Sequence, residues 1–541
     1  MVAAPHASTR MQRFLGGLGL GYLQTLLTIA VGLWLTPFLL GRLGQHTFGL
    51  WLVGAQVLAY LGLADLGLVA LVPRDVAHAK GLASQGPDGA RPRQMGAVVD
   101  DTAALVLGQM PIVALSGAAV WGVVASRWEG LGGPLGLTVT AFVLLFPLRM
   151  FPSILQGLQD LRYLGGVQLA AWVSGTAVTV VAMVFGAGLY SLAWGWILTQ
   201  GLTTAGCWWR LVRVFPDACP AFRPAAAVAT VGAMARGRVP DRVWRGLWIS
   251  VSQVAQVLLN GTDMLLIGTL LGPSAVVVYS CTGKLLLLLG NQPQLFMQMA
   301  APALSELRAT ASRDRLFQLS TAMSQAMLLG TGAIACVVLA VNEGFVAWWV
   351  GPERFGGTLL TGVLLLALIL RHWNDALSYT LFSLGHERRL ALTSIADGLV
   401  TVGAMLVLIP RFGMPGAALA SVAGLVLVSL PSKLGALARE EGVPVLAAVA
   451  PLGPWAARLA ALALAVAAAA AAWTPRGVVP VAVTGAVVST VYLLGMRGVL
   501  ASPLIGPRVA AALEPGVRRL PPAWRRMAGL AIPQLNTQTT S

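Results

Sequence analysis

Residues 48–72 read FGLWLVGAQVLAYLGLADLGLVALV, and Asp65 is the only charged residue among them. A transmembrane helix needs about 20 consecutive, mostly apolar residues to cross the hydrocarbon core of a bilayer. This stretch is long enough, and a carboxylate within such a helix is costly enough to require a partner or a function. We therefore expect a membrane-spanning helix in which Asp65 has a specific role.

The whole chain has the composition of a membrane protein. Charged residues make up 10% of it, against roughly 25% in soluble proteins. Residues of the AVILMFWYC set reach 57%, and the mean hydropathy is +0.77. The fold class is therefore predicted to be all-α and polytopic, and a soluble enzyme is disfavoured.

Apolar runs follow one another along the chain with only short polar breaks, which predicts about 14 transmembrane helices, with 12 as the alternative. The expected spans are Phe14–Leu40, Phe48–Val72, Ala97–Ala125, Pro134–Gln156, Leu164–Gly186, Leu189–Trp209, Gly246–Leu271, Ser274–Ala300, Leu316–Val341, Thr358–Ser383, Leu390–Ile409, Met414–Leu430, Leu452–Trp473 and Val478–Met496.

The basic residues give an orientation. Lysine and arginine in short loops stay on the cytoplasmic side, and most of the 36 fall in the segments that lie inside if the N-terminus is inside. The outside loops then hold only Arg42, Arg127, Arg354, Arg411 and Arg476. We expect a multi-pass protein of the cell's inner, cytoplasmic membrane with both termini cytoplasmic.

The formal charge of +16 follows from the same distribution. The positive charge is spread loop by loop along one membrane face, without the aromatic-interleaved patch that nucleic-acid binding needs. We expect contact with anionic membrane lipids and no nucleic-acid partner.

An internal echo indicates two lobes. Residues 43–51 read LGQHTFGLW and residues 271–279 read LGPSAVVVY, each at the outer mouth of a helical hairpin whose second helix runs inward to a proline, Pro73 or Pro302. Two six-helix lobes related by a pseudo-two-fold axis along the membrane normal would explain the echo.

This arrangement gives the expected domains. They are an N-terminal lobe over residues 1–210, a cytoplasmic linker over 211–245, a C-terminal lobe over 246–431, two extra helices over 432–497 and a cytoplasmic tail over 498–541.

Two segments resemble a known family. LTPFLLGRLGQHTFGLWLVGAQVLAYLGLADLGLVALVPRDVA, residues 35–77, is similar to the first hairpin of Wzx-type polysaccharide flippases, which belong to the multidrug/oligosaccharidyl-lipid/polysaccharide exporter superfamily. NGTDMLLIGTLLGPSAVVVYSCTGKL, residues 260–285, is similar to the opening of their second lobe. The resemblance covers the first twelve expected spans.

The resemblance implies a function. Such proteins move lipid-linked oligosaccharides, commonly undecaprenyl-diphosphate types, from the inner to the outer leaflet by alternating access between two lobes. It implies a role in making cell-surface polysaccharides such as O-antigen or exopolysaccharide. The partners it implies are a lipid-linked sugar diphosphate as substrate and a polysaccharide polymerase or other biosynthetic protein, with the transporter itself a monomer.

The sequence gives no sign of cofactor or metal chemistry. Cys207, Cys281 and Cys336 fall in expected spans and Cys219 in an inside loop, which disfavours a disulfide framework. The histidines are scattered, and no H-E-x-x-H, C-x-x-C or Walker motif occurs. We expect no catalytic residues, no cofactor and no metal site.

Arg371 is the leading candidate for binding an anionic substrate. It lies roughly 18 Å from either end of its expected span, and a guanidinium suits paired phosphate oxygens. His372, Asn374 and Asp375 cluster beside it. The alternative is an ion pair between Arg371 and Asp375, one helical turn apart.

Three further charges need partners. Asp263 lies about 12 Å and Lys284 about 15 Å below the outer ends of neighbouring antiparallel spans. We favour an ion pair between them over two independent cavity groups, because a lone buried charge is the costlier arrangement. Asp397 has no evident partner and is a candidate for cation or proton coupling.

Asp65 and Arg149 lie at the same depth, about 10 Å from the inner ends of the second and fourth spans. A contact between them would satisfy both charges and would serve either as a structural pair or as a cytoplasmic gate.

Three function classes remain. A flippase needs a roomy cationic cavity between its lobes, and Arg371 and the first hairpin favour it. A multidrug or cation antiporter of the same superfamily would use acidic residues, and Asp65 and Asp263 keep it open. A membrane glycosyltransferase or polymerase needs acidic groups on a large outer loop, and the longest, residues 342–357, has only Glu343 and Glu353.

Overall fold

The computed structural model describes residues 27–65, 67–83, 91–236, 251, 253–259, 261–294 and 313–500. These residues form helices and turns, with no β-strand among them, so the expected all-α class is confirmed. The chain divides into two compact units, Met1–Val257 (the first unit) and Leu258–Ser541 (the second unit).

The first unit consists of apolar helices joined by short turns. In order they are Leu27–Leu43, α2 (Gln45–Leu61), η1 (Gly62–Asp65), α3 (Leu68–Ala83), α4 (Arg91–Arg127), α5 (Gly132–Leu145), η2 (Pro147–Arg149), α6 (Met150–Gly157), α7 (Leu161–Val184), α8 (Leu189–Val214), η3 (Pro216–Ala218) and α9 (Pro224–Ala235).

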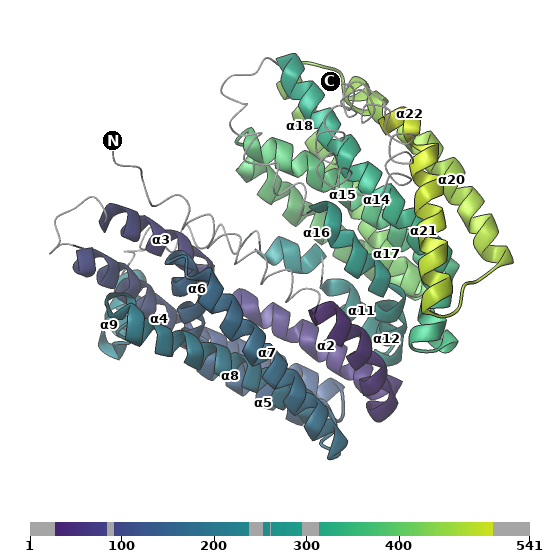
Figure 1. The fold of residues 1–541 in the computed structure, drawn as a ribbon. Helices are drawn as coiled ribbons and strands as arrows, with labels where there is room; N and C mark the ends of the chain where they lie inside the picture. The colour runs from purple at the N-terminus through teal and green to yellow at the C-terminus, as the bar shows by residue number, and fades with distance from the viewer. Residues whose placement is uncertain are drawn as a thin grey trace, which may run out of the picture. The chain divides into compact units, whose positions relative to one another are not determined.

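Small residues let α7 and α8 pack closely along their length (Figure 1). A Cβ atom on Gly175 would overlap Thr199, and one on Gly195 would overlap Thr179. Membrane helices associate through such close backbone approaches, because lipid tails leave no hydrophobic driving force between helices.

The second unit is built around the long helix α14. Its elements are α11 (Thr262–Leu270), α12 (Pro273–Thr282), the helix Lys284–Gln294, α14 (Arg313–Trp349), η4 (Pro352–Arg354), α15 (Thr358–Ser383), α16 (Glu387–Phe412), α17 (Met414–Gly424), the π-helix η5 (Leu425–Ser429), α18 (Leu430–Glu441), α19 (Val445–Val449), η6 (Ala450–Leu452), α20 (Gly453–Ala472), α21 (Val478–Gly495) and α22 (Arg497–Leu500).

The last two long helices, α20 and α21, pack on α14 (Figure 1, yellow). Tyr492 joins them to it, because its hydroxyl donates to the carbonyl of Leu329 at 2.9 Å while the Trp455 indole donates to that hydroxyl at 3.3 Å. This buried contact fixes both added helices to the rest of the second unit.

Eight of the described helices are long and apolar enough to cross a membrane, or ten if each of two bent pairs counts as one span. The polytopic class is therefore confirmed. The first residues of the first expected span lie outside the described residues. Pro302, the linker residues after 236 and the tail from 501 onward also lie outside them.

Several expected spans have a different course. The second is interrupted between α2 and α3, and the fourth bends by 60° between α5 and residues 147–157. The eighth bends by 50° at Gly283. The twelfth does not end at Leu430, because helical structure continues through α18 to Glu441.

The two segments of the internal echo share a local conformation. Gly44 (φ 76°) precedes α2, and Gly272 (φ 93°) precedes α12. Glycine adopts this left-handed region without the steric cost that a Cβ atom brings. Each helix that follows is broken before its apolar run ends, so the two stretches match in conformation as well as in sequence.

The orientation leads to a labelling prediction. Glu353, in η4, and Asp217, in η3, are both exposed. A single cysteine at Glu353 should react with a membrane-impermeant maleimide from outside intact cells, and one at Asp217 only after permeabilisation, because the basic residues place them on opposite sides. The background should carry Cys219→Ser, since Cys219 is partly exposed. Labelling of Asp217→Cys from outside would reverse the orientation.

Candidate functional site

Asp65 lies at the break between α2 and α3 in the first unit. Its carboxylate is 4% exposed, and Oδ1 accepts a hydrogen bond from the Gly67 N–H at 2.8 Å. Gln109 of α4 donates from Nε2 to the Asp65 carbonyl oxygen at 3.1 Å. Backbone groups freed by a helix break must be satisfied inside a membrane protein, so the carboxylate stabilises the break.

Arg149 lies at the second break of the same unit, in η2. Its guanidinium carbon is 5.4 Å from the centroid of the Phe142 ring and 5.9 Å from that of Phe146. The Nη1 atom is buried and has no hydrogen-bond partner in the described structure. Arginine over aromatic faces gains from cation–π attraction.

The expected contact between Asp65 and Arg149 needs correction. Arg149 lies within electrostatic range of Asp65, but among the described salt bridges none joins the two residues. The carboxylate is oriented by Gly67 and the guanidinium by two phenyl rings. The two charges therefore interact only through space.

In the second unit, Lys284 is the first residue after the bend at Gly283. Asn342 supports the bend, because its Nδ2 donates to the Thr282 carbonyl at 3.0 Å. The Lys284 ammonium lies 5.8 Å from the centroid of the Trp349 ring. The described structure records no hydrogen bond or ion pair for it.

Asp263 does not pair with Lys284 as expected. Its carboxylate accepts hydrogen bonds from the Met264 N–H at 2.8 Å and from the Tyr279 hydroxyl. The cation in electrostatic range is Arg371. Similar depth in neighbouring helices did not bring Asp263 and Lys284 together, because depth says nothing about the direction in which each side chain points around its helix.

Arg371 lies in the middle of α15, and two carboxylates, Asp263 and Asp375, are within its electrostatic range. One of its Nη2 hydrogens points to the Leu259 carbonyl at 3.4 Å. Asp375 accepts a hydrogen bond from Gln294 at 2.7 Å. The two carboxylates offset part of the charge of Arg371, and both its expected role in substrate binding and the alternative ion pair with Asp375 stay predictions.

The two other residues of this cluster face different neighbours. His372 is 2% exposed, and its Nδ1 is 2.7 Å from the Thr331 hydroxyl of α14. Asn374 accepts a hydrogen bond from Lys433 of α18. Consecutive helical positions point in different directions, so His372 acts in packing α15 on α14, while Asn374 belongs to a polar cluster on another face.

Asp397 is not without partners. It is 1% exposed, and its carboxylate accepts hydrogen bonds from Thr401 at 3.1 Å and from Ser429. Ser429 ends the π-helix η5. Such single π turns occur often at functional sites, because the extra residue changes the direction of the side chains that follow.

Lys433 was missed by sequence reasoning, which placed it in an inside loop. It is 3% exposed and donates to Asn374 Oδ1 and Ser378 Oγ, both at 2.8 Å. One signal was present: Leu430, Leu434 and Leu437 continue an apolar helical stripe past the expected end of the span. We call Asn374, Asp375, Ser378, Asp397 and Lys433 the buried polar cluster.

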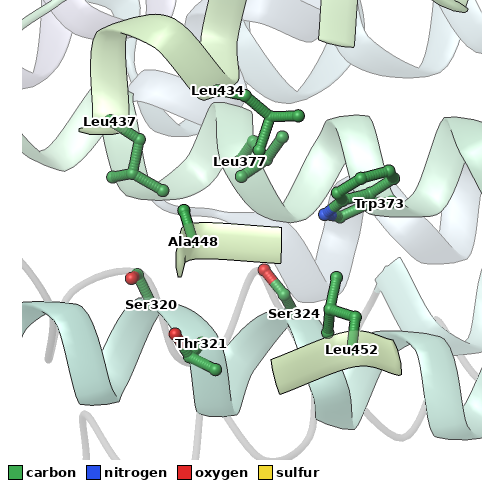
Figure 2. A pocket seen from close by; sticks show the side chains of 9 residues that line it. All are labelled: Ser320, Thr321, Ser324, Trp373, Leu377, Leu434, Leu437, Ala448 and Leu452. Atoms are coloured by element: carbon green, nitrogen blue, oxygen red, sulfur yellow. The ribbon is translucent and has the colours of Figure 1, made fainter. Parts of the chain in front are cut away.

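A small cavity lies on another side of α15 (Figure 2). Hydroxyls of Ser320 and Ser324 line it from α14, opposite Trp373, Leu377 and Leu434. Its volume is about 10 Å³, which is room for about one water molecule. It is far too small for a lipid-linked sugar.

We compared the chain with known protein families and proteins. The family model described as Polysaccharide biosynthesis protein matches residues 137–343, a stretch that includes parts of both units. Comparison with curated protein sequences found no match.

Two solved structures resemble the chain over most of its length. One is an inward-facing multidrug resistance MATE family transporter of the MOP superfamily, with a TM-score of 0.58, 16% identity, and coverage of 77% of this chain and 95% of that one. The other is the lipid II flippase MurJ in an inward closed conformation, with a TM-score of 0.61, 12% identity, and coverage of 88% and 99%. The predicted resemblance is confirmed at the level of the fold, and residues 137–343 match the polysaccharide biosynthesis family model.

The break at Asp65 leads to a stability prediction. Asp65→Asn keeps an acceptor oxygen for the Gly67 N–H and should unfold close to the wild type. Asp65→Ala leaves that N–H unsatisfied and should lose about 1–3 kcal/mol of stability. Thermal unfolding in detergent measures both. If the asparagine variant were as unstable as the alanine variant, the through-space attraction to Arg149 would outweigh the hydrogen bond.

The packing at Asp397 leads to a second prediction. A Cβ atom on Gly424 would overlap both the Asp397 carboxylate and the Thr401 hydroxyl, whereas one on Gly403 of α16 meets open space. Gly424→Ala should therefore cost about 1–3 kcal/mol, and Gly403→Ala should be near neutral. Equal thermal midpoints for the two variants would contradict the described packing.

Proposed function

We propose that this chain, which has the fold of MOP-superfamily transporters, flips a lipid-linked oligosaccharide of the undecaprenyl-diphosphate type. The observation that carries the proposal is the match of residues 137–343 to the polysaccharide biosynthesis family. The fold shared with a lipid II flippase supports it. Transport from the cytoplasmic to the outer leaflet by alternating access would supply lipid-linked units for cell-surface polysaccharide.

The cellular location in this proposal follows from the membrane orientation predicted by the basic residues. The proposal places the protein in the inner cell membrane with both termini in the cytoplasm, acting as a monomer beside a polysaccharide polymerase or another biosynthetic protein. In this proposal the partner proteins form and break the covalent bonds of the polysaccharide. This chain moves the substrate across the membrane without a covalent step.

A diphosphate headgroup needs a cation that is not already neutralised. Lys284 fits this requirement best among the residues described, because Arg371 has two carboxylates, Asp263 and Asp375, within its electrostatic range. The Lys284 ammonium has an aromatic ring for support at 5.8 Å. It also lies at the N-terminal end of the helix Lys284–Gln294, where the helix dipole favours an anion. We therefore propose Lys284 as a substrate-binding residue.

A multidrug or cation antiporter is the second candidate. The carboxylates Asp263, Asp375 and Asp397 within the second unit favour it, as does the fold shared with a multidrug transporter. The two candidates differ in the charge of their cargo. Flipping of a labelled undecaprenyl-diphosphate sugar in liposomes and efflux of a cationic dye from cells separate them.

The role of Lys284 can be tested by Lys284→Met, which keeps an unbranched apolar stem against Trp349 and removes the charge. Flipping of the labelled lipid by purified protein in liposomes should slow about ten- to a hundred-fold, because hydrogen bonds to charged groups contribute about 1.5–3 kcal/mol. Lys284→Arg keeps the charge and should retain part of the activity.

Arg476→Met is the matched control, since Arg476 is exposed in the turn between α20 and α21 and should transport normally. A Lys284→Met protein that unfolds at the wild-type temperature and flips the lipid at the wild-type rate would remove Lys284 from the binding site. Dye efflux without lipid flipping by the wild type would replace the proposed function with the antiporter.

A further inference from the structure

The buried polar cluster holds an ammonium deep inside the second unit. Lys433 is the fourth residue after Ser429, so the two side chains share one face of the helix that continues from the π turn into α18. Ser429 points to Asp397 and Lys433 to α15. The Lys433 position is about 10 Å along the helix from Glu440, too far inside for the amine to reach the membrane surface easily.

The atoms that touch the ammonium are neutral oxygens. Asn374 Oδ1 and Ser378 Oγ each lie 2.8 Å from Nζ. The Ser378 hydroxyl donates its hydrogen to the Asn374 carbonyl at 2.7 Å, so its lone pairs are directed to the amine. Amide and hydroxyl oxygens held in this way are also ligands for hard metal cations.

Two carboxylates lie farther from the ammonium, within its electrostatic range. Asp375 and Asp397 are the charged groups in electrostatic range of Lys433, and Arg371 lies in range of Asp375. Each carboxylate accepts hydrogen bonds from neutral donors, Gln294 for Asp375 and Thr401 and Ser429 for Asp397. Two carboxylates are thus held within electrostatic range of one position, and a lysine amine of the protein itself fills that position.

We propose that Lys433 acts as a tethered cation that occupies a monovalent-cation site in the second unit. A carboxylate pair in an apolar interior requires a positive charge nearby. The lysine supplies it, so the native protein takes up no sodium or potassium at this position. Removal of the amine leaves the oxygens and both carboxylates in place and creates a site for a free alkali-metal cation.

The test compares thermal unfolding of purified full-length protein in sodium chloride and in choline chloride at equal ionic strength, at neutral pH. The wild type should show the same midpoint in both salts. Lys433→Ala should be less stable than the wild type in choline, and about 200 mM sodium should raise its midpoint by roughly 5 °C through mass action on the folded state.

A second variant locates the effect. Lys433→Ala combined with Asp397→Asn removes one of the two carboxylate charges and should lose the sodium response. Lys433→Arg keeps a tethered cation and should show no response. Three results would overturn the proposal: a sodium-specific rise in the wild type, a Lys433→Ala protein that unfolds identically in both salts, or one that cannot be folded in either. The thermal-unfolding experiment measures cation binding. Its outcome therefore does not depend on whether the protein flips lipids.

Discussion

A charge or an open backbone group within an apolar helix bundle has to find its partner inside the protein, because hydrocarbon provides none. This constraint accounts for the positions of the polar residues in both units. Asp65 and Gln109 satisfy the backbone where α2 ends, and Asn342 does the same where α12 ends. At these two helix breaks, a buried side chain therefore replaces missing intrahelical hydrogen bonds.

The same constraint separates two kinds of cation. Arg371 and Lys433 lie among carboxylates, and their charges are largely balanced within the second unit. Lys284 lies over an aromatic ring instead, with no carboxylate recorded in its electrostatic range in the described part of the chain. An aromatic face lowers the cost of burying the stem while leaving the charge unneutralised. A cation of the second kind keeps more of its attraction for an anionic ligand, which is why Lys284 and not Arg371 carries the substrate proposal.

The sequence predicts the helices well, because a helix that crosses the hydrocarbon core needs about 20 mostly apolar residues, and hydropathy detects such a stretch directly. It does not predict which charges meet. Depth estimates put Asp263 near Lys284 and Asp65 near Arg149, but side-chain direction around each helix decides contact, and breaks and bends change that direction. The π turn before Ser429 has no signature in the hydropathy, so Lys433 was placed in a loop and Asp397 was left without partners.

The buried polar cluster also changes how the acidic residues bear on function. In a cation antiporter, carboxylates must alternate between binding the cargo and binding the coupling ion. Asp397 is buried and accepts hydrogen bonds from two hydroxyls, and an ammonium held by α15 lies within its electrostatic range. A carboxylate engaged in this way stabilises the packing of α15, α16 and α18 and has little capacity left for a second cation. Its presence is therefore weak support for drug export, and the match to the polysaccharide biosynthesis family has more weight.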